Sequence, residues 1–568
     1  MPYPIKYIEN NLVWNIEGEC FAYYELIPFN YSFLSLEQKD AVHDAFRQLI
    51  AQNRDGKIHA LQISTESSIR AAQERSKKSV TGRLKEIACA EIDEQTENLV
   101  ASLGDTQVDY RFFLGFKLVV TDKELSVKNV GKQVKNVLSD AMNAISSSFM
   151  GDFVSMPNDE IRRYIRMEKL MENKLSRRFK VRRLNKNDFG YLLEHIYGRT
   201  GTAYEDFAFT LPLKKRMRDT LVKKYDLIKP ARCLIEEKQR YLHMKSEDSE
   251  SYVAYFTISD VVGELDFPSS EIFYYQEQQF DFAIDTSMNV EIITNKAALH
   301  TVRNKKKELK DLDNHAWENN SETTNQVAEA LDSVDELESV LDQSKESMYK
   351  LSYVVRVTAP DVEELKRRCN QVRDFYDDAS IKLVRPIGDM MGLHNEFIPA
   401  SKRYMNDYVQ YVTSDFLAGL GFGATQMLGE RDGIYLGYNV DTDQNVYVQP
   451  ARAAQGVKGS VTNALSGAFL GSLGGGKSLS FNLLTYYAVL NGAQALILDP
   501  KSERGLWKEK LPEIADEINI VNLTSDEENK GMLDPYIIMR KTKDAESLAL
   551  DVLTFLTGIS SRDGKLFP

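Results

Sequence analysis

Apolar and polar residues alternate along the first thirty residues of the chain, which is the pattern of strands with one buried face. The alternation breaks at Glu17-Gly18, where glycine accepts a positive φ at little cost, so we predict a hairpin with its turn there. Ser35 and Gln38 have the spacing of a capping box and predict the start of a helix. This order is typical of an α+β domain, and it should continue as strand, long helix and strand over residues 57–65, 66–102 and 110–121.

Residues 293–347 differ from the preceding part of the chain both in their charge and in the spacing of their apolar residues. Eleven acidic residues and one lysine lie between Asp311 and Glu346, and apolar residues recur among them at helical spacing. We predict a charged helical hairpin over residues 293–347, whose apolar stripe packs within the protein rather than in a partner's groove. That stripe consists of Val327, Leu331, Val334 and Leu341.

A second strand-helix-strand pattern follows the hairpin. Residues 349–359 alternate like a strand, residues 360–379 open with a proline and are amphipathic, and residues 380–387 form another apolar run. The apolar, glycine-rich segment 415–428 is too short to span a membrane and is expected to be a buried linker. Paired strands from about residue 430 then lead into the last part of the chain.

The segment GSLGGGKS, residues 471–478, fits the pattern G-x-x-x-x-G-K-[ST] of a phosphate-binding loop. It lies between an apolar run that predicts a strand and an amphipathic run that predicts a helix. In such a loop the backbone N–H groups point at phosphate oxygens, Lys477 reaches the β and γ phosphates, and the Ser478 hydroxyl ligates Mg²⁺. We therefore predict ATP and Mg²⁺ as cofactors. The predicted nucleotide-binding residues are Gly471, Ser472, Leu473, Gly474, Gly475, Gly476, Lys477, Ser478 and Leu479, with Ser478 also the metal ligand.

Asp499 ends the next apolar run, and two roles are open for it. It resembles a Walker B carboxylate, which holds the magnesium shell. However, Pro500 follows where a catalytic glutamate is expected, and this run is the first after the loop helix. The alternative places Asp499, Lys501 and Glu503 at the carboxyl end of a second strand, near the nucleotide face but not holding the metal. The sequence therefore identifies no catalytic residue.

Composition narrows the function classes. Lys and Arg total 71 against 84 Asp and Glu, and the net charge of −13 argues against a surface that coats nucleic acid. The four cysteines are far apart and indicate neither a disulfide framework nor a zinc site. The N-terminus lacks the apolar core of a signal peptide, and no apolar run approaches the about 18 residues of a membrane span. We expect a cytoplasmic protein.

Residues 161–183 form the densest positive stretch, with ten Lys or Arg and two Glu. A solvated helix face or a contact with an acidic partner is the favoured interpretation, because a charge run says little about its ligand. A contact with nucleic acid or anionic lipid is the alternative.

The order of these elements and the motifs GSLGGGKS, LILDPKSE and LDPY resemble the large cytoplasmic ATPase of conjugative type IV secretion systems, a branch of the FtsK/HerA-like translocases. The N-terminal stretch beginning NLVWNIEG is similar to members from Gram-positive conjugative elements. The resemblance implies a multidomain α/β and α+β chain with an incomplete RecA-like P-loop ATPase domain. The expected parts are an α+β N-terminal domain over 1–292, the helical hairpin insertion over 293–347, a second α+β unit and linker over 348–428, and the ATPase domain over 429–568.

This resemblance also implies a function. The chain would be the ATP-binding motor subunit of a DNA-transfer machine, working as a hexamer at the cytoplasmic face of the membrane with membrane-anchored partners. The family's Walker B strand, sensor and trans-acting arginine would lie beyond Pro568, so a C-terminally truncated motor is expected. Two alternatives stay open: a nucleotide-binding assembly module without turnover, and a translocase or helicase that acts directly on DNA through residues 161–183.

Overall fold

A computed structural model gives the fold of the chain. It describes residues 3–53, 56–104, 106–119, 158–197, 221–223, 233–246, 250–261, 267–280, 282–318, 325–430, 432–442, 444–451, 454, 466–522 and 530–558. The chain divides into two compact units, the first made of residues 1–80 and 89–488 and the second of residues 81–88 and 489–568.

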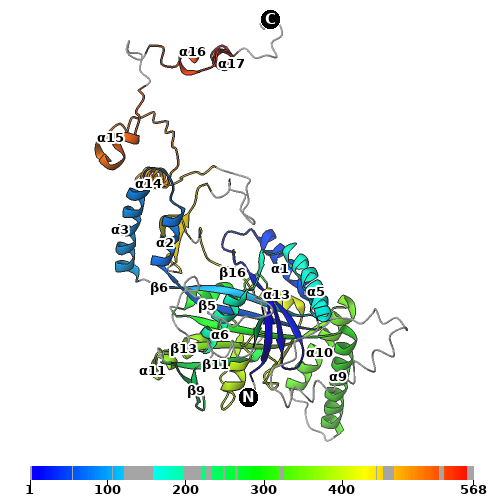
Figure 1. Ribbon diagram of the computed structural model, residues 1–568. Coiled ribbons are helices and arrows are strands. Elements are labelled where there is room, and N and C mark those ends of the chain that lie inside the picture. Colours follow the sequence, from blue (N-terminus) through cyan, green and yellow to red (C-terminus); the bar gives the residue numbers. More distant parts are fainter. Residues whose placement is uncertain are drawn as a thin grey trace. The chain divides into compact units, whose positions relative to one another are not determined.

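One large sheet organises the first unit (Figure 1). Its main path has the order β8-β1-β2-β3-β6-β5-β12-β13-β11-β10-β9, and the pairings found between the described strands are antiparallel. The strands of the sheet are β1 (Ile5–Glu9), β2 (Leu12–Asn15), β3 (Cys20–Leu26), β5 (Lys57–Ser68), β6 (Thr106–Lys117), β7 (Val181–Arg183), β8 (Leu221–Lys223), β9 (Leu234–Glu237), β10 (Leu242–Lys245), β11 (Glu250–Val261), β12 (Ile284–Ile293), β13 (Met348–Ala359), β14 (Ile381–Val384) and β15 (Gln410–Val412).

Helices and two smaller strand pairs complete the first unit. The short strands β4 (Phe29–Asn30) and β16 (Ala424–Thr425) pair in parallel, and β17 (Ile434–Tyr438) and β18 (Asn445–Val448) form an antiparallel pair. The helices are α1 (Leu36–Ala51), α2 (Ile69–Ser79), α3 (Lys85–Leu103), α5 (Asn158–Ser176), α6 (Lys186–Tyr197), α8 (Ile272–Gln279), α9 (Asn295–Glu318), α10 (Asn325–Ser344), α11 (Val362–Asp378), α12 (Met390–Asn395), α13 (Ser414–Gly419) and α14 (Lys477–Leu490).

Several local expectations are confirmed. Strands β2 and β3 form the predicted hairpin, and Gly18 in its turn has a φ of 82°. The Ser35 hydroxyl accepts the Gln38 N–H and the Gln38 side chain accepts the Ser35 N–H, so the capping box opens α1 as predicted. One expectation is wrong: the single helix over residues 66–102 is two helices. Strand β5 runs to Ser68, and α2 ends before a bend at Gly82, whose φ of 95° is incompatible with a continuous helix.

Both faces of the sheet are buried. Successive residues of a strand point to opposite faces, and here neighbours such as Tyr23 and Tyr24 belong to two different buried clusters. Phe112 and Phe113 divide in the same way, and all four side chains are essentially inaccessible to solvent. In a sheet with one solvated face, apolar and polar residues alternate along each strand. Both faces are buried here, so β3 and β6 contain consecutive apolar residues instead.

The seam between β5 and β12 joins strands from distant parts of the chain. Leu61 of β5 lies opposite Ser287 of β12, and the register runs from Lys57 to Gln62 without a break. Strand β13 then pairs with β12 along the whole length of β12. The sheet thus combines strands from before the helical hairpin with strands that follow it.

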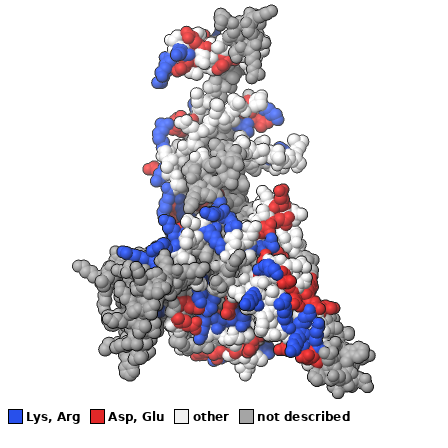
Figure 2. Space-filling view, turned by 90° about the vertical axis from the view of Figure 1, so that its right-hand side faces the viewer, with Lys and Arg blue, Asp and Glu red and all other residues white. Residues whose placement is uncertain are grey.

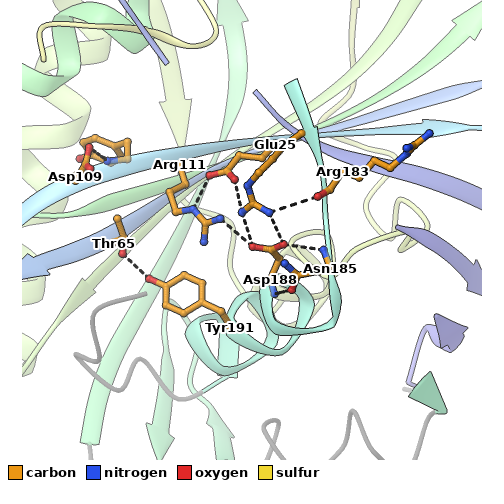
Figure 3. Close-up of polar contacts among 10 residues, drawn as sticks. Glu25, Thr65, Asp109, Arg111, Arg183, Asn185, Asp188 and Tyr191 are labelled. Carbon is orange, nitrogen blue, oxygen red and sulfur yellow. Dashed lines mark hydrogen bonds and ion pairs between the residues drawn. The ribbon is translucent and has the colours of Figure 1, made fainter. Parts of the chain in front are cut away.

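A buried ion cluster ties α6 to the sheet (Figure 3). Arg111 Nε donates to Glu25 at 2.7 Å, and its Nη2 donates to Asp188 at 3.1 Å. Arg182 pairs with the same two carboxylates, and only 2% of the Arg111 side chain is exposed. Each buried charge therefore has an opposite charge in contact, which offsets its desolvation.

The basic stretch 161–183 is partly committed to structure. It covers most of α5 and all of β7. Arg183 pairs with Glu168 and Glu172 of α5, and Arg182 belongs to the buried cluster of Figure 3. At these two positions the positive charge balances carboxylates of the protein itself. Figure 2 shows Lys and Arg side chains lying among Asp and Glu side chains on the face that it draws.

The charged hairpin predicted over 293–347 is present as α9 and α10. Arg303 and Lys306 of α9 pair with Glu338 of α10, so the basic and acidic helices face each other. Leu341 is buried in a small cluster with residues of α9, and Val334 packs against it, so the prediction is confirmed for these two of the four stripe residues. This cluster contains Ala298, Leu299, Val302, Leu341 and Met348.

The second unit is mostly helical turns. Its elements are α15 (Trp507–Lys510), a 3₁₀ helix (Pro512–Glu517), α16 (Pro535–Ile538) and α17 (Thr542–Thr557). Within the unit, Arg83 pairs with Glu517 at 2.8 Å. Few of its apolar side chains are enclosed: Ile514 is 5% exposed, whereas Leu496 and Phe555 are 89% and 87% exposed.

Candidate functional site

The candidate site is the glycine-rich loop that opens α14. Gly474 and Gly476 have φ values of 78° and 79°, a region that side chains with a Cβ rarely adopt. The Gly475 N–H donates to the carbonyl of Ser472 at 3.1 Å, which curls the loop into a turn, and α14 begins at Lys477 directly after it. The sequence needs glycine at 474 and 476 because this turn passes through positive φ twice.

Lys477 lies over the curled loop. Its Nζ donates to the carbonyl of Ser472 at 2.6 Å, so the ammonium group is held on the loop side of the helix start. A Cβ added at Gly471 would come within 3.2 Å of the Lys477 side chain. Glycine at 471 therefore leaves room for the side chain of Lys477, which is a physical reason for glycine at the first position of the motif.

The loop fits a phosphate ligand. The first N–H groups of a helix lack carbonyl partners within the helix, and the helix dipole is positive at the same end, so an anion is favoured there. Ser472 and Leu473 in the loop and Ser478 and Leu479 in the first turn of α14 are all exposed. A phosphate can therefore approach the backbone and Lys477 without rearrangement of a core. The structure brings all nine predicted nucleotide-binding residues together in one loop and one helical turn.

The magnesium prediction rests on the Ser478 hydroxyl. It is exposed in the first turn of α14, beside the lysine that would contact the phosphates. Mg²⁺ takes oxygen ligands and keeps several waters, so one hydroxyl plus phosphate oxygens is an adequate set. No group of three or more His, Cys, Asp or Glu that could hold a metal is found in the described part of the chain. Ser478 stays the predicted protein ligand.

The strands expected on either side of the loop are not formed. Residues 466–472 and 493–499 are described and have no strand assignment, and neither do residues 518–522. A parallel strand needs a neighbour that supplies N–H and C=O partners, and no strand among the described residues pairs with these runs. Leu470 and Leu498, which a sheet would cover, are 90% and 84% exposed.

Asp499 belongs to the second unit, where it organises a tight turn. Its Oδ2 accepts the backbone N–H of Arg504 at 2.8 Å, and its Oδ1 lies 3.3 Å from the Arg504 guanidinium. Ser502 within the turn has a φ of 53°. Glu503 is exposed on the same turn. The carboxylate of Asp499 is thus engaged by a cation five residues along the chain.

Arg504, the partner of Asp499, was not predicted from the sequence. The signal was present in the run DPKSERG, where a basic residue follows the aspartate across a proline turn. Opposite charges at that separation meet only if the chain turns back. The residue pattern alone does not require such a turn.

Among the described residues no helix is long and apolar enough to cross a membrane.

Comparison with known proteins adds two findings. Residues 444–568 match the family model described as an AAA-like domain, and this span contains the loop, α14, Asp499 and α17. The chain is also 20% identical over 579 aligned residues to the Bacillus subtilis (strain 168) protein named Uncharacterized protein YddE. That alignment covers 96% of this chain and 67% of the relative. An ATPase domain of this kind suggests a nucleotide-dependent translocase activity. Residues 444–568 of this chain therefore carry an AAA-like domain, which is found in ATPases of the FtsK, HerA and TraG type.

Proposed function

We propose that this chain is the ATP-binding motor subunit that energises a conjugative type IV secretion machine for DNA transfer. The observation that carries the proposal is the loop at residues 471–478, with its positive-φ glycines and its lysine at the first position of α14. Its position inside the AAA-like match supports ATP as the ligand. The motifs LILDPKSE and LDPY add the resemblance to the secretion ATPases.

In this proposal the glycines of the loop, Lys477 and Ser478 each have a defined task. The glycines allow the backbone N–H groups to surround the phosphates, and Lys477 exchanges its contact with the Ser472 carbonyl for phosphate oxygens. Ser478 contributes its hydroxyl to the metal. Bound Mg²⁺ would neutralise the charge that develops on the phosphoryl oxygens.

The assembly is part of the same proposal. Motors of this family bind nucleotide between subunits, so we expect a homo-oligomer, a hexamer in the related secretion ATPases. We place it at the cytoplasmic face of the membrane, held there by membrane-anchored components of the machine. The family resemblance supports this arrangement.

Calorimetric titration of the chain with ATP tests the site. Lys477→Ala should weaken ATP binding by about tenfold or more, because it removes a charge-assisted contact to the phosphates. The matched control is Lys508→Ala, which removes an exposed lysine of α15. Circular dichroism should be unchanged in both variants. Equal ATP affinity for Lys477→Ala and the parent chain would refute the proposal.

A second candidate is a nucleotide-binding assembly module without turnover. The observation in its favour is the contact of Asp499 with Arg504, which occupies the carboxylate that would otherwise be the Walker B candidate. Under this candidate the chain binds ATP through the loop but hydrolyses it near the background rate. Robust steady-state hydrolysis that is lost in Asp499→Asn would exclude it and would assign Asp499 to the metal shell.

A further inference from the structure

A cavity of about 410 Å³ lies in the first unit between α11, β14 and the turn that joins β9 to β10. Four cations line it: Arg240 from the turn, Lys366 and Arg373 from α11, and Arg385 after β14. Phe256 and Cys369 lie at its base, where they are 3% and 4% exposed. The cavity therefore has a charged rim and an apolar floor.

The spacing of residues along α11 produces this arrangement. Residues Leu365, Cys369 and Val372 recur at helical spacing and are buried against the sheet. Lys366 and Arg373 are two turns apart on the neighbouring face, which borders the cavity. The same helix thus packs one face into the core and lines the cavity with its cations.

The local charge is positive although the chain as a whole is acidic. None of the residues that line the cavity is acidic, while the net charge of the chain is −13. Lys366 pairs with Glu363 at 2.7 Å, but both side chains are largely exposed and water screens the pair. Arg373 approaches Asp374 only to 4.0 Å, and its Nη2 donates to the neutral side chain of Asn370 at 2.8 Å. A multivalent anion can compete with these contacts.

Arg373 and Arg385 line the same cavity as Cys369. Burial raises the pKa of the Cys369 thiol, and the charges of Arg385 and Arg373 oppose that rise. Arginine binds phosphate through paired N–H donors, so two arginines that line one cavity suit a phosphate ligand.

We propose that this cavity binds a small phosphorylated ligand of mononucleotide size. Its volume is within the range of small-molecule sites, about 300–1,000 Å³. The arginines and Lys366 would take the phosphates, and Phe256 with Leu383 would cover an apolar or aromatic moiety. This site is made of different residues from the loop at 471–478, so it does not depend on the proposed motor function.

The test uses the full chain with Lys477→Ala, which is expected to weaken binding at the loop. ADP, inorganic pyrophosphate and adenosine are titrated calorimetrically into this protein. We expect ADP and pyrophosphate to bind and adenosine to bind about tenfold more weakly or not at all, since the phosphates supply the charge-assisted contacts. Adding Arg373→Gln and Arg385→Gln should lower the ADP affinity about tenfold or more.

Two further variants separate binding from folding. Lys366→Gln changes an exposed side chain and should weaken ADP binding while the thermal midpoint stays the same. Lys382→Gln, an exposed lysine of β14 that does not line the cavity, should leave ADP binding unchanged. Circular dichroism checks that each variant is folded.

Several results would overturn the proposal. These are the absence of ADP and pyrophosphate binding to the Lys477→Ala chain, an affinity that the cavity variants leave unchanged, or equal binding of adenosine and ADP. Preferential binding of an oligo(dT) strand or a polyglutamate peptide, lost in the same cavity variants, would assign the cations to a macromolecule instead.

Discussion

At the scale of single residues, the buried ion cluster of Figure 3 allows a direct test of how much a paired, buried cation contributes to the stability of the first unit. Arg111→Met should destabilise the first unit by about 3–5 kcal/mol, because Glu25 and Asp188 would lose a buried cation. The measurement is the midpoint of thermal unfolding. Arg70→Met is the control: Arg70 pairs with Glu97 on the surface, and its loss should hardly move the midpoint. Similar shifts in the two variants would contradict the structural role of the cluster.

Two buried histidines make the stability of the first unit depend on pH. Burial lowers the pKa of His59 and of His394 to about 3, and each ring nitrogen Nδ1 lies 2.8 Å from a tyrosine hydroxyl. Unfolded histidine has a pKa of about 6.5, so below that pH the unfolded chain binds more protons than the folded one. Stability is present above about pH 6.5 and should fall by up to about 1.4 kcal/mol per pH unit per histidine toward pH 3.

The thermal midpoint measured from pH 7 to pH 4 checks this expectation. His59→Gln should give a shallower fall than the parent chain, because one of the two proton-linked groups is gone. His300→Gln, which replaces an exposed histidine of α9, should follow the parent curve. If the slope is the same for His59→Gln and the parent, the buried-neutral assignment is wrong.

At the scale of elements, the α9–α10 hairpin is held by its apolar seam more than by its surface ion pairs. Leu341 is 2% exposed and its neighbour Val340 is 44% exposed. Leu341→Ala should weaken the hairpin by about 2–5 kcal/mol through lost burial and a cavity, whereas Val340→Ala should have little effect. Hydrogen exchange of amides in α9 and α10 is the measurement. Equal protection in the two variants would contradict the seam.

Local elements could be predicted from the sequence because their signals are local. The capping box at Ser35, the hairpin turn at Gly18 and the helical hairpin of α9 and α10 each depend on residues a few positions apart. Strand partners could not be predicted in this way, since the pairing of Leu61 with Ser287 depends on packing across the whole unit.

The candidate site shows the same limit. A motif of eight residues was enough to predict the loop, its helix and the position of Lys477, and the structure has them in that order. The flanking strands were predicted from apolar runs alone, and a strand forms only where another strand offers hydrogen-bond partners. The contact of Asp499 with Arg504 was not predicted because it requires a turn, and the spacing of apolar residues does not indicate one there.

At the scale of the whole molecule, the two units differ in how much apolar surface they enclose. The first contains two extensive buried clusters around the sheet, while the second exposes residues such as Leu496 and Phe555. Hydrogen exchange followed by mass spectrometry should therefore show amides of α17 exchanging at least about tenfold faster than amides of α11, because local opening is cheaper where few contacts are lost. Equal protection of these two helices would show that the second unit is stabilised by contacts other than buried apolar side chains.

The seam between β5 and β12 also sets the order of events while the chain is being made. His59 contacts Ser287 across this seam, and 228 residues separate them. At a synthesis rate of about 5–20 residues per second, β5 waits on the order of 10–45 s for its partner to leave the ribosome. During that time its edge is an open template for other strands. We therefore expect the nascent chain to depend on holding chaperones until β12 emerges, and release of stalled chains shorter than about 290 residues should yield aggregates rather than a soluble half-sheet.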